Sequence, residues 1–139
     1  MSQGLKPLPG PLVDSAQVRV LVCDDDDIFR EALSDLLEDE GFTLVGSAAG
    51  GSEGVALAQE LEPDVILMDL RVPFVDGIEA TRRITSSRAR VKVIMLSAYD
   101  DPALTRSATE SGVFSYLVKG CSPRLICDAL LEAWHDGRS

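Results

Sequence analysis

Short apolar runs alternate with amphipathic stretches along most of the chain. Each run has strand length and is rich in β-branched residues, and each stretch after it repeats its apolar residues at helical spacing. The predicted strands are Val18 to Cys23, Phe42 to Val45, Val65 to Met68, Val91 to Leu96 and Phe114 to Val118. The predicted helices are Ile28 to Glu40, Ser52 to Leu61, Gly77 to Thr85, Pro102 to Ser111 and Ser122 to His135. Strict alternation predicts an α/β fold whose parallel sheet is covered by helices on both faces.

The beginning of the chain has a different composition from the rest. Residues 1–16 carry three prolines and two glycines among polar residues, too little apolar surface to offset the entropy of ordering. We therefore expect a flexible leader over residues 1–16 and one folded domain over residues 17–139. Gly41 is expected to close the first helix.

Composition narrows the partners and the compartment. An apolar fraction of 45% over 139 residues suits a single core, and a net charge of −10 opposes binding to nucleic acid or to an anionic membrane. Cys23, Cys121 and Cys127 are irregularly spaced and are expected to be reduced thiols. No signal peptide or run of roughly 18 apolar residues is seen. These features predict a cytoplasmic protein that binds cations or other proteins.

Polar residues follow four of the five predicted strands. Asp24 to Asp27 come after the first strand, Asp69 after the third, Ser97 after the fourth and Lys119 after the fifth. Parallel sheets bind ligands outside the carboxyl ends of their strands, so these side chains are expected to share one crevice. Converging carboxylates repel one another unless a cation lies among them, and Mg²⁺ prefers oxygen ligands. Together with Lys119 and Ser97, such a site suits a transferring phosphoryl group, with a carboxylate as the nucleophile.

Each of these residues, taken alone, has an ordinary structural explanation. An aspartate after a strand is usually a turn or helix-capping residue, and Asp27 is a candidate cap for the first helix. Ser97 alone suits a loop hydroxyl, Lys119 a surface cation, and Tyr116 a core position. The functional interpretation rests on the joint occurrence of compatible groups at four strand ends of one predicted edge.

Four segments of the sequence resemble the sequence blocks of response-regulator receiver domains. They are VLVCDDDDIFR, VILMDLRVPFVDG, VIMLSAY and FSYLVKGCSP, in the order and spacing of that family, and they cover Val18 to about Trp134. The resemblance implies a CheY-like, flavodoxin-like fold: a doubly wound, five-stranded parallel sheet with the strand order 2-1-3-4-5.

The resemblance also implies roles for individual residues. Asp69 would be the phosphoacceptor, and Asp24 and Asp25 would hold Mg²⁺ together with Asp69 and the backbone carbonyl of Arg71. Ser97 and Lys119 would bind the phosphoryl oxygens. The acidic pair is placed at Asp24 and Asp25, rather than at Asp26 and Asp27, because these two residues directly follow the apolar strand.

Two tyrosines fall on further positions of the same family. Tyr116 matches the aromatic residue whose rotamer follows activation, so Ser97 and Tyr116 are expected to form the switch. Tyr99 lies two residues beyond Ser97, where its side chain is expected to line the site and to obstruct the water that hydrolyses the phosphoryl group.

The implied partners are those of two-component signal transduction. A sensor histidine kinase would donate the phosphoryl group, and phosphorylation would change a partner surface or drive homodimer formation. Apart from its own phosphorylation and dephosphorylation, the domain is expected not to be an enzyme. MDLRVP and KGCSP resemble the NarL/FixJ group, whose receivers precede a LuxR-type helix-turn-helix. DNA binding for transcription control would then belong to an effector domain outside this chain. The chain is then either a domain cut from a longer regulator or a stand-alone receiver, and we expect the former.

Two alternatives from other classes stay open at this point. Asp24-x-Asp26 after an apolar strand, with Ser97 and Lys119, imitates the motifs of a haloacid-dehalogenase-like phosphatase, although Asp69 would then have no role. A receiver-like module that binds proteins without being phosphorylated is the second alternative. Against it, every position of the phosphorylation site carries a competent residue.

Overall fold

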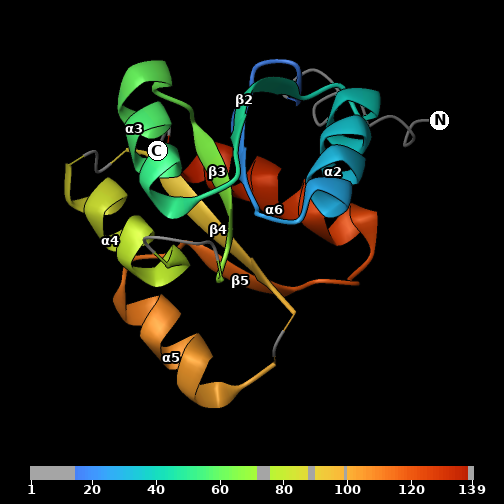
Figure 1. Ribbon diagram of the computed structural model, residues 1–139. Coiled ribbons are helices and arrows are strands. Elements are labelled where there is room, and N and C mark those ends of the chain that lie inside the picture. Colours follow the sequence, from blue (N-terminus) through green and yellow to red (C-terminus); the bar gives the residue numbers. More distant parts are fainter. Residues whose placement is uncertain (1–14, 72–75, 88–89, 99, 138–139) are drawn as a thin grey trace, which may run out of the picture.

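All five predicted strands and all five predicted helices are present (Figure 1). The structure is a computed structural model that describes residues 15–71, 76–87, 90–98 and 100–137. The strands are β1 (Arg19–Cys23), β2 (Thr43–Ala48), β3 (Val65–Asp69), β4 (Lys92–Ser97) and β5 (Ser115–Val118). The helices are α2 (Asp27–Asp39), α3 (Gly51–Leu61), α4 (Gly77–Ser87), α5 (Pro102–Glu110) and α6 (Pro123–Asp136). The largest difference from the predicted bounds is in β2, which continues to Ala48 rather than ending at Val45.

The strands form one parallel sheet in the order β2-β1-β3-β4-β5. This order confirms the predicted doubly wound, flavodoxin-like topology. The chain passes from β1 outward to β2 and then returns to β3 on the other side of β1. The order therefore reverses between β1 and β3, and a crevice is expected at the carboxyl ends of these two strands.

The two faces of the sheet carry separate apolar clusters. Val20 and Val22 of β1 pack into the cluster under α2 and α6, whereas Leu21 and Cys23 pack into the cluster under α3, α4 and α5. Figure 1 shows α2 and α6 on one side of the strands and α3 and α4 on the other. All five residues of β3 are buried because helices cover both faces. This is why the central strands appear in the sequence as unbroken apolar runs.

Helix α2 is held at both ends by local backbone chemistry. The Asp26 carboxylate accepts hydrogen bonds from the backbone N–H groups of Ile28 and Phe29, at 3.0 and 3.1 Å. The cap is therefore Asp26 and not Asp27, the capping residue considered from the sequence. Gly41 has a φ of +90° just after the helix, as expected of the glycine that closes it.

The packed structure includes the last two residues of the expected leader. Ser15 is buried, and the carbonyl of Ala16 accepts a hydrogen bond of 2.9 Å from the Thr43 hydroxyl. Residues 1–14 lie outside the described residues.

The helices and the cysteines of the described residues agree with what the composition indicates. None of their helices combines the length and the apolar character needed to cross a membrane. Cys23, Cys121 and Cys127 all carry free thiols, as expected from their irregular spacing. Burial raises the pKa of the Cys23 thiol to about 12, because the thiolate would be desolvated and would face Glu53 and Asp24.

Gly77, the first residue of α4, lies close to the backbone at the end of β3, and its N–H donates to the Leu70 carbonyl at 2.8 Å. A Cβ atom at this position would lie 2.2 Å from the Asp69 carbonyl oxygen. We expect Gly77→Ala to lower the free energy of unfolding by about 1–3 kcal/mol, since backbone rather than a flexible side chain must move. Chemical denaturation would measure the change.

Gly137→Ala is the matched control for this substitution. Its Cβ would have only ordinary contacts, with the nearest atom at 3.6 Å. An equally small effect of both substitutions would contradict the proposed close approach at Gly77.

Candidate functional site

Three carboxylates meet at the crevice between β1 and β3. Asp24 and Asp25 directly follow β1, and Asp69 is the last residue of β3. One oxygen from each carboxylate lies within 4.8 Å of the others. Asp24 and Asp69 are only 2% and 6% exposed, whereas Asp25 faces solvent. The predicted grouping of these three residues is therefore present, although they are up to 45 positions apart in the sequence.

Lys119 brings a positive charge to the same crevice from the end of β5. Its ammonium nitrogen is 2.8 Å from Asp24 Oδ2 and 3.4 Å from Asp69 Oδ1. The Lys119 backbone N–H donates to the Ser97 carbonyl at 2.7 Å, which continues the pairing of β4 with β5 beyond the strand. Strand pairing thus places the lysine opposite the carboxylates.

The charges in this crevice are not balanced. Burial, and then repulsion by Asp24, raises the pKa of Asp69 from 3.8 to about 6, even though Lys119 opposes the shift. Burial alone would lower the pKa of Lys119, but its hydrogen bond to Asp24 and the attraction of Asp69 outweigh burial, and the pKa is raised. Lys119 therefore stays protonated, and its single charge does not offset the neighbouring carboxylates.

The four consecutive aspartates after β1 have different surroundings. Asp24 Oδ1 accepts a 2.9 Å hydrogen bond from the Asp26 backbone N–H, and the Asp26 carboxylate caps α2. The Arg30 guanidinium donates to the Asp24 carbonyl at 2.6 Å and forms a 2.6 Å ion pair with Asp27. Asp26 and Asp27 thus support the turn, while Asp24 and Asp25 lie at the crevice with Asp69.

The other residues predicted for the site have more varied positions. Ser97 ends β4 and is fully buried, next to Leu96, the β4 partner of Asp69. Tyr116 lies in β5 and is partly buried, and Arg71 is exposed two residues beyond Asp69. Tyr99 lies outside the described residues, so its predicted place at the site stays a prediction.

One contact of the site was not anticipated from the sequence. The ring of Phe29, in the first turn of α2, lies beneath the Lys119 ammonium, with 4.4 Å between the nitrogen and the ring centroid. In the sequence, Phe29 falls on the apolar face of a helix together with Leu33 and Leu37. That pattern predicts a core residue, and no local signal connects it with a lysine 90 positions away.

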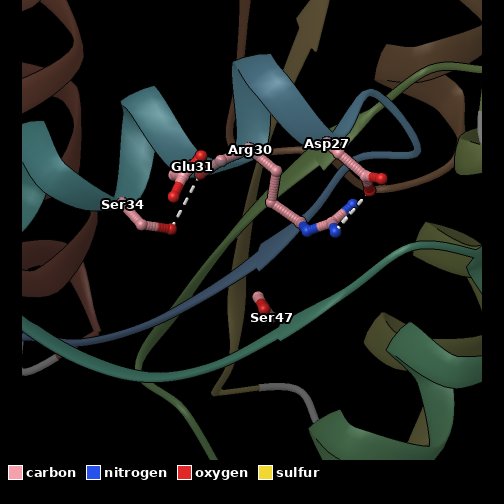
Figure 2. Close-up of a pocket in the computed structure, with 5 residues that line it drawn as sticks. All are labelled: Asp27, Arg30, Glu31, Ser34 and Ser47. Atoms are coloured by element: carbon pink, nitrogen blue, oxygen red, sulfur yellow. Dashed lines mark hydrogen bonds and ion pairs between the residues drawn. The ribbon is translucent and has the colours of Figure 1, made fainter.

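A separate hollow lies beside the turn, between α2 and β2 (Figure 2). Its volume is about 390 Å³. Figure 2 shows the Arg30 side chain reaching toward Asp27, with Ser47 of β2 facing α2 across the gap. The lining residues are Asp27, Arg30, Glu31, Ser34 and Ser47. The hollow does not include the three clustered carboxylates or Lys119, so it is distinct from the crevice.

The fold and the crevice together define a doubly wound α/β protein with an acidic site at its topological switch point. Residues 20–131 match the response regulator receiver domain. The chain therefore belongs to the family of response-regulator receiver domains. This membership confirms the resemblance seen in the sequence and does not favour the phosphatase alternative.

Its curated relatives include transcriptional regulators. The chain is 41% identical over 121 residues to the transcriptional regulatory protein LnrK of Bacillus subtilis, covering 86% of this chain and 54% of LnrK. It is 42% identical over 117 residues to LiaR of the same organism, covering 84% and 56%. The response regulator UvrY of Escherichia coli is 34% identical over 122 residues, covering 87% and 56%. The chain thus spans about half the length of the curated relatives it matches.

Solved structures lead to the same family. The signal receiver domain of NarL from Mycobacterium tuberculosis superposes with a TM-score of 0.82 at 33% identity, covering 85% of this chain and 96% of that one. A CheY-like receiver from Methanospirillum hungatei also gives 0.82, at 25% identity, covering 87% and 96%. The similar structures include NarL and a LuxR-family regulator from Aurantimonas, the type that the MDLRVP and KGCSP segments resemble.

The raised pKa of Asp69 predicts a pH dependence of stability in the absence of divalent cations. A carboxyl whose pKa is higher in the folded protein favours folding below its unfolded value, and this contribution is lost as the pH rises through the folded value. For Asp69 this window runs from 3.8 to about 6. We expect Asp69→Asn to be more stable than the unmodified protein at pH 7, by up to about 3 kcal/mol, and the difference to shrink toward pH 4.

Urea denaturation at several pH values, in the presence of a chelator, would measure this difference. Asp39→Asn, an exposed change in α2, controls for the loss of one negative charge. A stability difference for Asp69→Asn that does not vary between pH 4 and pH 7 would contradict the prediction.

Proposed function

We propose that Asp69 is the phosphoacceptor of this receiver domain and that a sensor histidine kinase is the donor. The observation that carries the proposal is the crevice itself, where a nearly buried aspartate lies 3.4 Å from a lysine ammonium and beside two further carboxylates. In the transfer step, an Asp69 carboxylate oxygen would bond to phosphorus as the bond from phosphorus to the donor imidazole nitrogen breaks. The phosphoryl group would then be held as an acyl phosphate.

Lys119 is suited to meet the charge of the incoming group. Its ammonium already lies within 3.4 Å of the acceptor carboxylate, so it would bind a phosphoryl oxygen without a large movement. Ser97 would add a hydroxyl hydrogen bond from the end of β4. Hydrolysis of the acyl phosphate within the same site would return the domain to its resting state.

Mg²⁺ fits the donor set of this crevice. Receiver domains usually bind this ion at an acidic pocket, and Asp24, Asp25 and Asp69 offer clustered oxygens with excess negative charge. We propose that these three side chains and the backbone carbonyl of Arg71 would hold the ion. When bound, it would supply positive charge to offset the charge that develops during transfer.

Ser97 and Tyr116 are proposed to form the switch that carries phosphorylation to a partner surface. Met95 and Ser97 are two residues apart in β4, so their side chains point to the same face of the sheet. Met95 pairs with Tyr116 on β5. Tyr116 packs against the apolar cluster under α3, α4 and α5. A movement of Ser97 toward Asp69 would therefore change the space beside Tyr116 and shift the population between two packings.

The output of this switch is proposed to be the control of transcription. LnrK and LiaR are transcriptional regulators about twice as long as the matched region, so the DNA-binding function would belong to an effector domain outside this chain. Homodimer formation on phosphorylation and a cytoplasmic location form part of the same proposal. If the chain were instead a receiver-like module that binds proteins without being phosphorylated, acetyl phosphate would not label it.

Acetyl phosphate with Mg²⁺ provides the direct test of the phosphoacceptor. We expect the intact protein to gain the mass of one phosphoryl group. Asp69→Asn should gain none, because the amide is nearly isosteric but not nucleophilic. Circular dichroism would confirm that the variant is folded. Equal labelling of Asp69→Asn and of the protein without a substitution would contradict the proposed role of Asp69. If the protein without a substitution were not labelled, the result would favour a module that binds proteins without being phosphorylated.

A comparison of neighbouring aspartates tests the metal assignment. We expect Asp25→Ala to weaken Mg²⁺ binding at least about tenfold, as measured by calorimetry, and to slow phosphorylation as well. Asp26→Ala should retain Mg²⁺ binding but lose about 1 kcal/mol of stability, because it removes the helix cap. Weaker Mg²⁺ binding in Asp26→Ala alone would show that the acidic pair had been placed one residue too early.

A further inference from the structure

The aromatic ring of Phe29 contacts the Lys119 ammonium from within the protein. The nitrogen lies 4.4 Å from the ring centroid, inside the roughly 6 Å over which a cation is attracted to an aromatic face. The same nitrogen makes ion pairs with Asp24 and Asp69 at 2.8 and 3.4 Å. Lys119 therefore contacts an aromatic ring in addition to the two carboxylates.

The backbone and the packing of α2 determine where this ring lies. The Phe29 backbone N–H donates to the Asp26 carboxylate at 3.1 Å, as part of the helix cap. The ring is partly buried and packs against the apolar cluster under α2 and α6. Its neighbour Ile28 is 80% exposed, so the first turn of α2 directs Phe29, and not Ile28, into the protein. The ring is a fixed surface for the flexible lysine.

A fixed surface is useful because the carboxylates that contact Lys119 are also the proposed ligands of Mg²⁺. In the proposed function, Asp24 and Asp69 would also bind Mg²⁺, which would weaken their hold on the ammonium. A lysine has four rotatable bonds and loses considerable rotamer entropy when it is held in one place. The Phe29 ring does not bind the metal, so its attraction for the ammonium would persist.

We propose that Phe29 is a positioning residue, whose ring face holds the Lys119 ammonium in the crevice ready for a phosphoryl oxygen. The inference rests on the proposed role of Asp69. In this proposal Phe29 acts through its contact with Lys119 and not on the phosphoryl group itself.

Fluorinated phenylalanines at position 29 test this attraction with little change of shape. Successive fluorine atoms withdraw electron density from the ring face and weaken its attraction for a cation. With acetyl phosphate at saturating Mg²⁺, we expect the rate of Asp69 phosphorylation to fall stepwise, by about threefold to tenfold for the trifluorinated ring. Phe29→Leu should be at least as slow, and Phe29→Tyr should stay close to the unmodified protein.

Phe42 provides the matched control. It is a buried phenylalanine of the same apolar cluster. It lies just before β2, at the amino end of the parallel sheet, whereas Lys119 follows the carboxyl end of β5. Trifluorination at Phe42 should leave the rate unchanged. An unchanged or faster rate with the trifluorinated ring at position 29, or an equal loss at both positions, would overturn the inference.

Nuclear magnetic resonance gives a readout that does not depend on phosphorylation. The sequence has lysines only at positions 6, 92 and 119, so their ε-methylene signals are readily assigned. The ring current of Phe29 should shift the Lys119 signal upfield, and Phe29→Leu should remove that shift. Absence of the shift would overturn the inference. If the protein without a substitution accepted no phosphoryl group, the phosphoacceptor proposal would fail. The ring-current shift would still decide whether the Phe29 ring holds the Lys119 ammonium.

Discussion

The crevice depends on the burial of like charges that one lysine only partly balances. Asp24 and Asp69 are almost fully buried beside each other, and Lys119 pairs with both. Burial and mutual repulsion make the ionised form of Asp69 costly, which appears as its raised pKa. A cation or a change of protonation relieves this cost. The same imbalance is the physical basis for the proposals that the crevice binds Mg²⁺ and that Asp69 accepts a phosphoryl group.

The architecture maintains this unfavourable arrangement because packing elsewhere stabilises it. The three inner strands, β1, β3 and β4, are buried on two faces, and their apolar side chains fill the clusters on either side of the sheet. The charged residues lie at the ends of those strands, where the backbone is already held by strand pairing. Three residues hold the adjoining turns. Arg30 donates to the Asp24 carbonyl, Asp26 caps α2, and Gly77 allows α4 to begin close to the end of β3. The stability of the core thus permits strain in the site.

Membership of the receiver family and the local chemistry support each other, but they answer different questions. The family accounts for the fold and for a role in two-component signalling. The geometry indicates which groups are available for chemistry, and it separates the four consecutive aspartates by their contacts. Asp26 and Asp27 are engaged by the helix cap and by Arg30, which leaves Asp24 and Asp25 beside Asp69.

The sequence by itself determined the alternation of strands and helices, because apolar periodicity reports directly which faces are buried. It also predicted that Asp24, Asp69 and Lys119 share one edge, since parallel strands direct their carboxyl ends the same way. Only the tertiary structure decided that Asp26 caps α2, because four identical side chains in a row differ in environment and not in composition. The contact between Phe29 and Lys119 likewise joins residues 90 positions apart on separate elements. Local patterns contain no record of such contacts, which arise when the packing of helices on the sheet sets their distance.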